Sequence, residues 1–225
     1  MTFCVYTEAM LTRLLDLFFP LSSLTGVEGT WLTNDEKAEL MHALSTIMIP
    51  ASHLQKHGCT ELDELRAVME YNATPLLHCA IHTWKYRRIR AFDDMMTSLI
   101  ASLSVPENLE RDCVICPVPL HWSRTWDRGF NQADILAQQL SISWQREVVH
   151  LLTRTRATGH QAHRSKQERW SALTKAFSVK KECIIPAEVI LVDDIFTTGA
   201  TLQECAKTLK AAGVKSVRGV VLARG

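Results

Sequence analysis

The stretch Val189-Ile190-Leu191-Val192-Asp193-Asp194-Ile195-Phe196-Thr197-Thr198-Gly199-Ala200-Thr201 decides the fold of this chain. Its first four residues are apolar and mostly β-branched, which is typical of a buried strand in a parallel sheet. Two adjacent carboxylates and a loop of small residues follow, and residues 202–212 then show helical spacing that ends at Gly213. The stretch predicts a strand, an acid pair, an anion-binding loop and a helix, in that order.

The loop at residues 197–201 has the composition of a phosphate site. A helix N-terminus offers free backbone N–H groups, and Gly199 lets the backbone turn close to an anion. Further donors are the hydroxyl groups of Thr197, Thr198 and Thr201. Carboxylates do not bind phosphate, so Asp193 and Asp194 are expected to accept hydrogen bonds from sugar hydroxyls. A phosphate beside a sugar indicates a ribose 5-phosphate group, whereas an acidic turn before a capped helix would leave the acids without a packing purpose.

The same stretch resembles the signature of the type I phosphoribosyltransferases, which bind phosphoribosyl pyrophosphate (PRPP) together with Mg²⁺. The resemblance implies that Asp193 and Asp194 are the catalytic residues. It implies PRPP contacts from Asp193, Asp194, Thr197, Thr198, Gly199, Ala200 and Thr201. In such an enzyme the protein mainly positions the reactants and stabilises an oxocarbenium-like state, so no nucleophilic side chain is expected.

The composition is that of an ordinary globular protein. Of the 225 residues, 47% are hydrophobic and 22% are charged. No apolar run approaches the ~18 to 20 residues that a membrane helix needs, and Glu8 and Asp16 stand where a signal peptide would be basic. The seven cysteines have no regular spacing, which is typical of reduced thiols. We therefore expect a cytoplasmic protein without membrane insertion.

The charge distribution divides the chain into two parts. Residues 1–75 carry 4 Lys and Arg against 10 Asp and Glu, whereas residues 76–225 carry 21 against 14. We expect residues 1–75 to form a small helical N-terminal lobe and residues 76–225 a phosphoribosyltransferase-like domain. Hydrophobic spacing predicts the helices of the lobe at Tyr6–Phe19, residues 34–49 and residues 60–69.

Residues 76–225 predict an α/β fold with helices on both faces of a parallel sheet. The expected strands lie near residues 113–118, 148–152, 189–192 and 217–222. The substrate should bind at the carboxyl edge of this sheet. The isomer of the Val118–Pro119 bond is left open by the sequence.

Three patterns before and within the first of these strands have competing explanations. Residues 84–90 (Trp-Lys-Tyr-Arg-Arg-Ile-Arg) suit stacking on bases, but the stronger explanation is the solvated first turn of an amphipathic helix. His78 and His82 have the i, i+4 spacing of metal ligands, although partly buried histidines are commoner. Cys113 and Cys116 are three residues apart in a strand, which favours two buried thiols on opposite faces over a zinc or redox pair.

A loop with two arginines follows the strand at residues 113–118. Its position at the carboxyl end of a parallel strand suits a polyanion, so we expect it to bind pyrophosphate. The candidate residues are His121, Arg124, Arg128 and Gly129. The run Pro117 to Gln132, with Pro-Val-Pro-Leu-His and Arg-Gly-Phe-Asn-Gln, resembles a block of the ComF/GntX subfamily. Residues 151–177 are also similar to that subfamily.

Residues 150–170 predict a mobile basic loop. Its candidate residues are Arg154, Arg156, Gln161, Arg164 and Arg169. The loop is either a flap over pyrophosphate, a landing strip for single-stranded nucleic acid, or a solvated segment. Family members usually carry two Cys-x-x-Cys pairs after the Phe-Pro at residues 19–20, where this chain reads Leu-Ser-Ser-Leu-Thr-Gly. Zinc needs about four ligands, so we expect no zinc and no zinc ligands from the protein.

Three functions remain open. The chain is an active phosphoribosyltransferase in base or nucleotide salvage, an accessory protein, or a non-catalytic PRPP-sensing regulator. The ComF resemblance implies the accessory role, in which the protein helps imported single-stranded DNA during natural transformation, together with protein partners of the DNA-uptake machinery. In that role Trp84, Tyr86 and Trp122 would be the DNA-binding aromatics.

Overall fold

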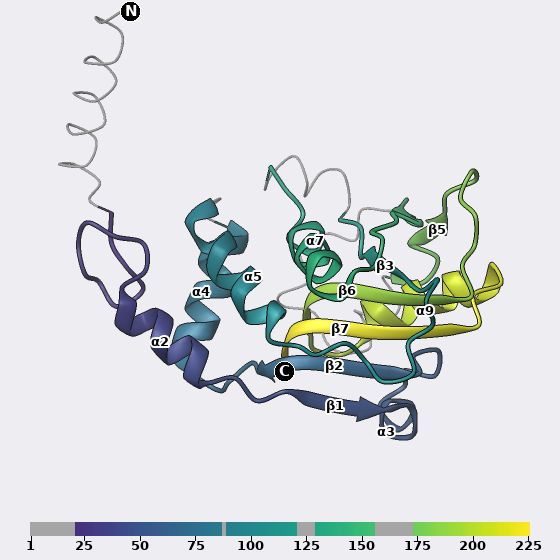
Figure 1. Ribbon diagram of the computed structural model, residues 1–225, viewed down its shortest axis with the longest axis horizontal. Helices are drawn as coiled ribbons and strands as arrows, with labels where there is room; N and C mark the ends of the chain where they lie inside the picture. Colours follow the sequence, from purple (N-terminus) through teal and green to yellow (C-terminus); the bar gives the residue numbers. More distant parts are fainter. Residues whose placement is uncertain (1–20, 87–88, 121–128, 156–172) are drawn as a thin grey trace, which may run out of the picture.

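The computed structural model describes residues 21–86, 89–120, 129–155 and 173–225. Its centre is a five-stranded sheet with the strand order β1-β2-β7-β6-β3. Strand β1 is antiparallel to β2, and the neighbours β2–β7, β7–β6 and β6–β3 are parallel (Figure 1). The strands are β1 (Ile47–Pro50), β2 (Glu64–Glu70), β3 (Val114–Pro117), β6 (Glu188–Phe196) and β7 (Ser216–Arg224).

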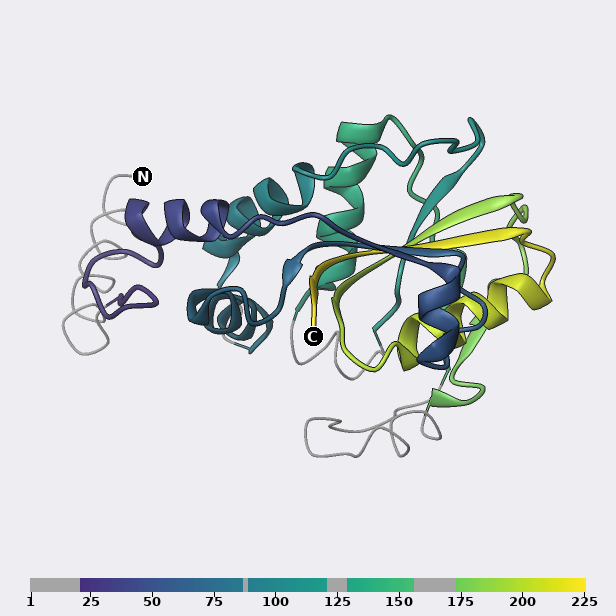
Figure 2. The same cartoon turned by 90° about the horizontal axis from the view of Figure 1, so that it is seen from below.

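Helices cover both faces of this sheet, as the α/β prediction requires (Figure 2). One face carries α4 (Pro75–Tyr86), η1 (Arg90–Phe92), α5 (Asp93–Ala101) and α7 (Gln132–Trp144). The other face carries α3 (Ala51–Lys56), α9 (Ala200–Ala211) and the hairpin of β4 (Leu152–Arg154) and β5 (Phe177–Val179). Helix α2 (Asn34–His42) packs against α4.

Each face has its own hydrophobic core, because successive strand residues point to opposite sides. In β6, Ile190 and Val192 belong to the core under α4, α5 and α7. Val189 and Leu191 belong to the core under α3 and α9. Between two such cores β6 is buried on both sides, which explains its continuous apolar run.

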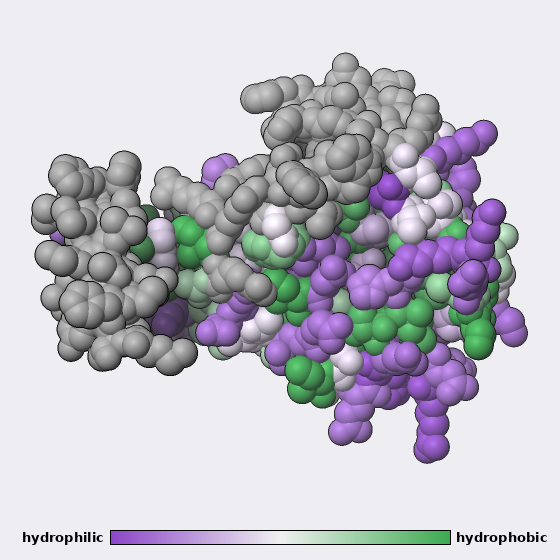
Figure 3. Space-filling view, turned by 90° about the horizontal axis from the view of Figure 1, so that it is seen from above, coloured by the Kyte–Doolittle hydropathy of each residue, from purple (hydrophilic) through white to green (hydrophobic). Residues whose placement is uncertain are grey.

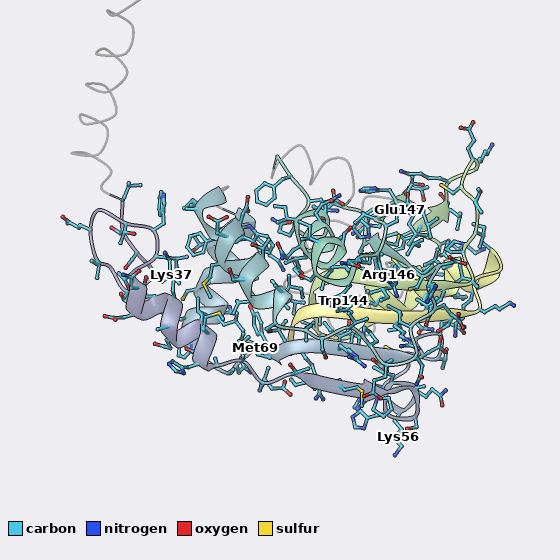
Figure 4. All side chains as sticks on the ribbon, in the orientation of Figure 1. Lys37, Lys56, Met69, Trp144, Arg146 and Glu147 are labelled. Atoms are coloured by element: carbon cyan, nitrogen blue, oxygen red, sulfur yellow. The ribbon has the colours of Figure 1, made fainter. Side chains whose placement is uncertain are left out.

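Contacts in the first core hold its elements together. The Trp144 indole N–H donates to the Leu103 carbonyl (2.9 Å) and ties α7 to the end of α5. Met69, near the carboxyl end of β2 (Figure 4), is fully buried in the same core as α4.

On the surface shown in Figure 3, polar side chains surround smaller apolar areas. None of the helices in the described ranges is both long and apolar enough to span a membrane.

The structure confirms the predicted strands near residues 113–118, 189–192 and 217–222 and divides the one near 148–152. Val148 forms a parallel bridge with Ile115 of β3. The chain then turns, and β4 pairs antiparallel with β5 in a separate two-stranded sheet. The sequence pattern missed this division because the partner of β4 lies more than twenty residues further along the chain.

Two of the helices predicted for residues 1–75 are wrong in extent or type. The helix at 34–49 ends at His42, and residues 47–50 are strand β1. Residues 64–70 form strand β2 instead of a helix: β2 pairs with β1 and β7, and its two faces contribute to different cores. Leu65 and Val68 therefore enter different cores, although their spacing also suits a helix. The remaining predicted helix, Tyr6–Phe19, lies outside the described residues.

These strands also bear on the expected boundary at residue 75. Strands β1 and β2 precede residue 75 and belong to the same sheet as β6 and β7, which follow it. The expected boundary therefore separates strands of one sheet. Helix α2 does begin where the sequence allowed: Thr33 is its N-cap, and Thr33 and Glu36 form a reciprocal capping box.

The two cysteines around β3 are buried thiols on opposite faces, as predicted. Cys113 lies in the core under α5 and α7, and Cys116 lies in the core under α9. Burial raises the pKa of Cys113 to about 12 and that of Cys116 to about 11, so both stay protonated at neutral pH. The Val118–Pro119 bond is trans.

Candidate functional site

The acid pair lies at the carboxyl end of β6, beside the end of β7. Helix α4 lies near this edge of the sheet, where the C-terminus is marked in Figure 1. Strand alternation sends the two carboxylates to opposite faces. Asp194 points toward α4, where it meets Lys85. Asp193 acts on the other face: burial is the main cause of the raised pKa of the Cys205 thiol in α9, and Cys116 and then Asp193 raise it further.

Lys85 is the partner of Asp194. Its Nζ lies 2.7 Å from Asp194 Oδ2, and the two side chains are only 15% and 13% exposed. The sequence pattern assigns Lys85 to a solvated or DNA-binding run and does not reveal this contact. The two residues are far apart in sequence, so only the packing of α4 against the sheet edge brings them together.

The pKa of Asp193 is raised above the ordinary value of an aspartate. Burial raises its pKa to about 7, and the negative charge of Asp194 acts in the same direction. Three effects oppose this rise: the Asp194 backbone N–H donates to Asp193 Oδ1 (2.8 Å), and the positive charges of Lys85 and Arg154 lie nearby. With this pKa, the protonation state of Asp193 would change near neutral pH.

Arg154 belongs to the basic segment predicted from the sequence. It ends strand β4, and its guanidinium carbon lies 5.4 Å from the centre of the Phe177 ring. Strand β4 packs on the core under α9, on the face opposite to Lys85, and the positive charge of Arg154 lowers the pKa of Asp193. The other candidates of this segment, Arg156, Gln161, Arg164 and Arg169, lie outside the described residues.

The predicted anion loop joins β6 to α9. Gly199 is the N-cap of α9 and has a left-handed backbone with φ +76°. Thr198 Oγ1 accepts a hydrogen bond from the Ala200 backbone N–H (3.4 Å). Gly199 and Ala200 are buried, Thr198 and Thr201 are half-buried, and Thr197 is exposed. The loop thus presents hydroxyl and amide groups at a helix N-terminus next to two carboxylates.

The ends of the predicted pyrophosphate loop are fixed at the same edge of the sheet. The Val118 backbone N–H donates to the Val192 carbonyl of β6 (2.9 Å). Asn131, the N-cap of α7, donates from Nδ2 to the Val118 carbonyl (3.1 Å). Gly129 is exposed and has φ +79°. His121, Arg124 and Arg128 lie outside the described residues, but the loop that carries them begins and ends beside β6.

Known proteins resemble this chain in sequence. Residues 126–225 match the family described as "Phosphoribosyl transferase domain". The chain is 42% identical to Competence protein F of Haemophilus influenzae over 114 residues. These residues make up 49% of this chain and 49% of the relative. It is 29% identical to Competence protein ComFC of Bacillus subtilis over 167 residues, or 69% of this chain and 63% of that protein.

A further relative matches most of the chain. The DNA utilization protein YhgH of Escherichia coli is 32% identical over 194 residues, which cover 77% of this chain and 79% of the relative. The chain belongs to the ComF family. With respect to Competence protein F, it spans about half the length of that relative. The phosphoribosyltransferase-like fold expected from the sequence is thereby confirmed.

One expectation drawn from the ComF resemblance is wrong for Trp84. The indole is fully buried in α4, its N–H donates to Asp93 Oδ1 (2.7 Å), and its ring lies 6.3 Å from the Phe130 ring. Trp84 therefore anchors the end of α4 and does not offer a face to DNA. Trp122 lies outside the described residues.

The described residues of this ComF-family chain contain no group of three or more His, Cys, Asp and Glu side chains that suits a metal ion. His78 and His82 are neighbours on α4, with ring centres 6.5 Å apart, and have no third such ligand in that part of the chain. Mg²⁺ is a different case, because it binds through one or two carboxylates plus ligand phosphates. The carboxylate oxygens of Asp193 and Asp194 are suitable ligands for Mg²⁺ in this way.

Gly199 is the position where the loop tolerates least change. A Cβ added there would press against Cys59 Sγ and lie 2.7 Å from Phe196 Cζ, in addition to adopting an unfavourable φ. We predict that Gly199→Ala lowers the free energy of unfolding by roughly 2–4 kcal/mol. Gly129→Ala is the matched control, because its φ is +79° with open space around the Cβ. We expect it to cost only about 1 kcal/mol. Equal losses in urea unfolding would contradict the tight packing at Gly199.

Proposed function

We propose that this protein binds a ribose 5-phosphate group, presented by PRPP with Mg²⁺ or by a related phosphoribosyl ligand. The observation that carries the proposal is the β6–α9 junction, where two carboxylates precede a loop of hydroxyl and amide donors within nine residues of chain. The hydroxyl and amide donors of the loop suit a phosphate, and the two carboxylates suit the hydroxyl groups of a ribose.

Each part of the ligand has candidate partners. The 5-phosphate would bind at residues 197–201, and the ribose hydroxyls would donate to Asp193 and Asp194. The acid pair would also hold Mg²⁺, which neutralises charge on the phosphate groups of the ligand. The pyrophosphate would bind the loop of His121, Arg124, Arg128 and Gly129, whose ends lie beside β6.

The cations of the site support an anionic ligand. Lys85 and Arg154 flank the acid pair on opposite faces of the sheet. Lys85 uses one of its three N–H donors on Asp194, so the ammonium group retains donors for a neighbouring oxygen. The cations thus limit the repulsion between the two carboxylates and a polyanion.

We further propose a competence-related role, because the relatives bear the names Competence protein F, Competence protein ComFC and DNA utilization protein. In this role the protein handles imported single-stranded DNA, with Arg154, Arg156 and Arg164 as candidate contacts to the phosphate backbone. Proteins of the DNA-uptake machinery are the proposed partners. Transfer of the phosphoribosyl group is the second candidate, which the proton exchange of Asp193 near neutral pH favours.

The ligand proposal predicts a defined pH dependence. Asp193 accepts hydrogen bonds best as a carboxylate, so affinity for PRPP·Mg²⁺ should rise from about pH 6 to about pH 8 and then level off. Asp193→Asn should bind about 10- to 100-fold more weakly at about pH 8 and lose this pH dependence. Calorimetry measures both, and removing Mg²⁺ with a chelator should weaken binding by the native protein.

Asp112→Asn is the control for this experiment. Asp112 is exposed and precedes β3 at the amino edge of the sheet, opposite the site, so its removal should leave the affinity unchanged. Absence of PRPP binding by the native protein would refute the proposed ligand. Release of pyrophosphate with a panel of bases would separate the transfer reaction from binding alone.

The DNA proposal predicts a salt-dependent interaction. Replacing Arg154, Arg156 and Arg164 with Ala should weaken binding of labelled single-stranded DNA. It should also reduce the slope of log affinity against log salt concentration by about 0.7 for each DNA phosphate that the variant no longer neutralises. The control replaces Lys37 and Lys56, which are exposed and lie on α2 and α3 (Figure 4). Binding that is independent of salt and of these arginines would exclude the basic segment as the DNA-binding surface.

A further inference from the structure

The acid pair is engaged by donors of the protein itself. Lys85 Nζ lies 2.7 Å from Asp194 Oδ2, and the two side chains are only 15% and 13% exposed. The Asp194 backbone N–H donates to Asp193 Oδ1 (2.8 Å). Each carboxylate therefore has one oxygen occupied, and the occupant of Asp194 is a full positive charge.

The end of α4 holds Lys85 in this place. The preceding residue, Trp84, is fully buried, donates to Asp93 Oδ1 (2.7 Å) and has its ring 6.3 Å from the Phe130 ring. Lys85 lies in the last turn of α4, where the helix dipole favours a positive charge. Its backbone is thus anchored, whereas its flexible four-carbon side chain can carry the ammonium group to another acceptor.

An ammonium group and a divalent cation compete for the same carboxylate oxygens. Mg²⁺ binds carboxylates directly, and the charge of Lys85 at Asp194 Oδ2 would repel it. Solvent screens this repulsion only weakly, because both side chains are mostly buried. A divalent cation can therefore bind Asp194 well only if the ammonium group moves away.

An ammonium group that leaves Asp194 needs another acceptor. The anchored end of α4 keeps Lys85 near the carboxyl edge of the sheet, and a partly buried charge without a partner is costly. A free metal ion offers no acceptor, whereas a phosphorylated ligand brings oxygens together with its cation. The ion pair thus favours a cation that arrives with a polyanion over the cation alone.

We propose that Lys85 is an internal counter-cation, which excludes free divalent cations from Asp194 and admits them together with a phosphorylated ligand. Cation and ligand then bind cooperatively, and Lys85 carries part of the coupling between them. The inference rests on the proposed function, which assigns the acid pair to Mg²⁺ and a phosphoribosyl ligand. It adds an autoinhibitory contact that regulates this site.

The test measures binding of Mn²⁺ alone to the full chain by electron paramagnetic resonance. Mn²⁺ prefers the same oxygen ligands as Mg²⁺, and at about pH 8 Asp193 is mostly charged. Lys85→Met removes the competing charge, so it should bind Mn²⁺ about tenfold more tightly than the native protein. Lys85→Gln can still donate a hydrogen bond to Asp194 and should show the same gain, which keeps the test decisive if the Met variant does not fold. Lys85→Arg keeps the charge and should exclude Mn²⁺ as the native protein does.

The same variants test the coupling to the ligand. PRPP should strengthen Mn²⁺ binding by the native protein about tenfold more than it strengthens binding by Lys85→Met, after correction for the complex of Mn²⁺ and PRPP in solution. The reason is that the variant has no ion pair left for the ligand to release.

A second lysine–aspartate pair provides the matched control. Lys210 Nζ, in the last turn of α9, lies 2.9 Å from Asp63 Oδ1, and Asp63 precedes β2 at the amino edge of the sheet. Lys210→Met breaks this pair far from the acid pair, so the affinity for Mn²⁺ should stay native. Adding Asp194→Asn to Lys85→Met should abolish the gain, because the carboxylate that binds the cation is then lost.

Three outcomes would overturn the inference. Lys85 does not exclude the cation if Lys85→Met and Lys85→Gln bind Mn²⁺ no more tightly than the native protein. The gain is not a property of the acid pair if Lys210→Met shows it equally or if it survives Asp194→Asn. Lys85 does not couple cation and ligand if PRPP strengthens Mn²⁺ binding equally in the native protein and in Lys85→Met.

The proposed function is tested separately, by calorimetry of the native protein with PRPP and Mg²⁺. Binding of PRPP together with unchanged Mn²⁺ affinity in the Lys85 variants would refute this inference and leave the proposed function standing. Absence of PRPP binding would refute the proposed function and the coupling, whereas the Mn²⁺ affinities would still decide whether Lys85 guards Asp194.

Discussion

Consecutive side chains of a β-strand point to opposite faces of the sheet, and this constraint governs the acid pair of the ComF-family chain. Asp193 and Asp194 lie near the carboxyl end of β6, a strand that is buried between two cores. Neither carboxylate is readily accommodated there without a positive charge, since buried charges are costly unless they are compensated. Helix α4 supplies Lys85 on one face, and strand β4 brings Arg154 near the other. One dipeptide thus interacts with two elements that are distant from it in sequence.

The two acids differ in consequence. Asp194 has an ion pair at 2.7 Å, whereas burial keeps Asp193 partly protonated near neutral pH. The site therefore combines an ion-paired carboxylate with one whose charge depends on pH and ligand. A bound cation or a set of sugar hydroxyls favours the charged form of Asp193 and so lowers its pKa. The affinity for such a ligand is therefore coupled to proton release.

The part of the site that is local in sequence could be predicted from it. Strand β6, the loop at 197–201 and helix α9 follow one another without interruption, so hydrophobic pattern and loop composition were sufficient. The contacts that depend on distant pairing were not accessible. Lys85 meets Asp194 only through tertiary packing, and β2 was predicted as a helix because its apolar spacing fits both structures. Trp84 was considered for DNA binding, although its burial makes it an anchor of α4.

Asp193 is expected to be both the titrating group and a contact of the ligand. The most direct measurement is a carbon-13 NMR titration of the aspartate carboxyl groups in the full chain, assigned with Asp193→Asn. Asp193 should titrate near pH 7 in the free protein, and ribose 5-phosphate with Mg²⁺ should move its pKa well below that value. An Asp193 that titrates near its ordinary pKa of about 3.9, or whose titration ignores the ligand, would contradict this role.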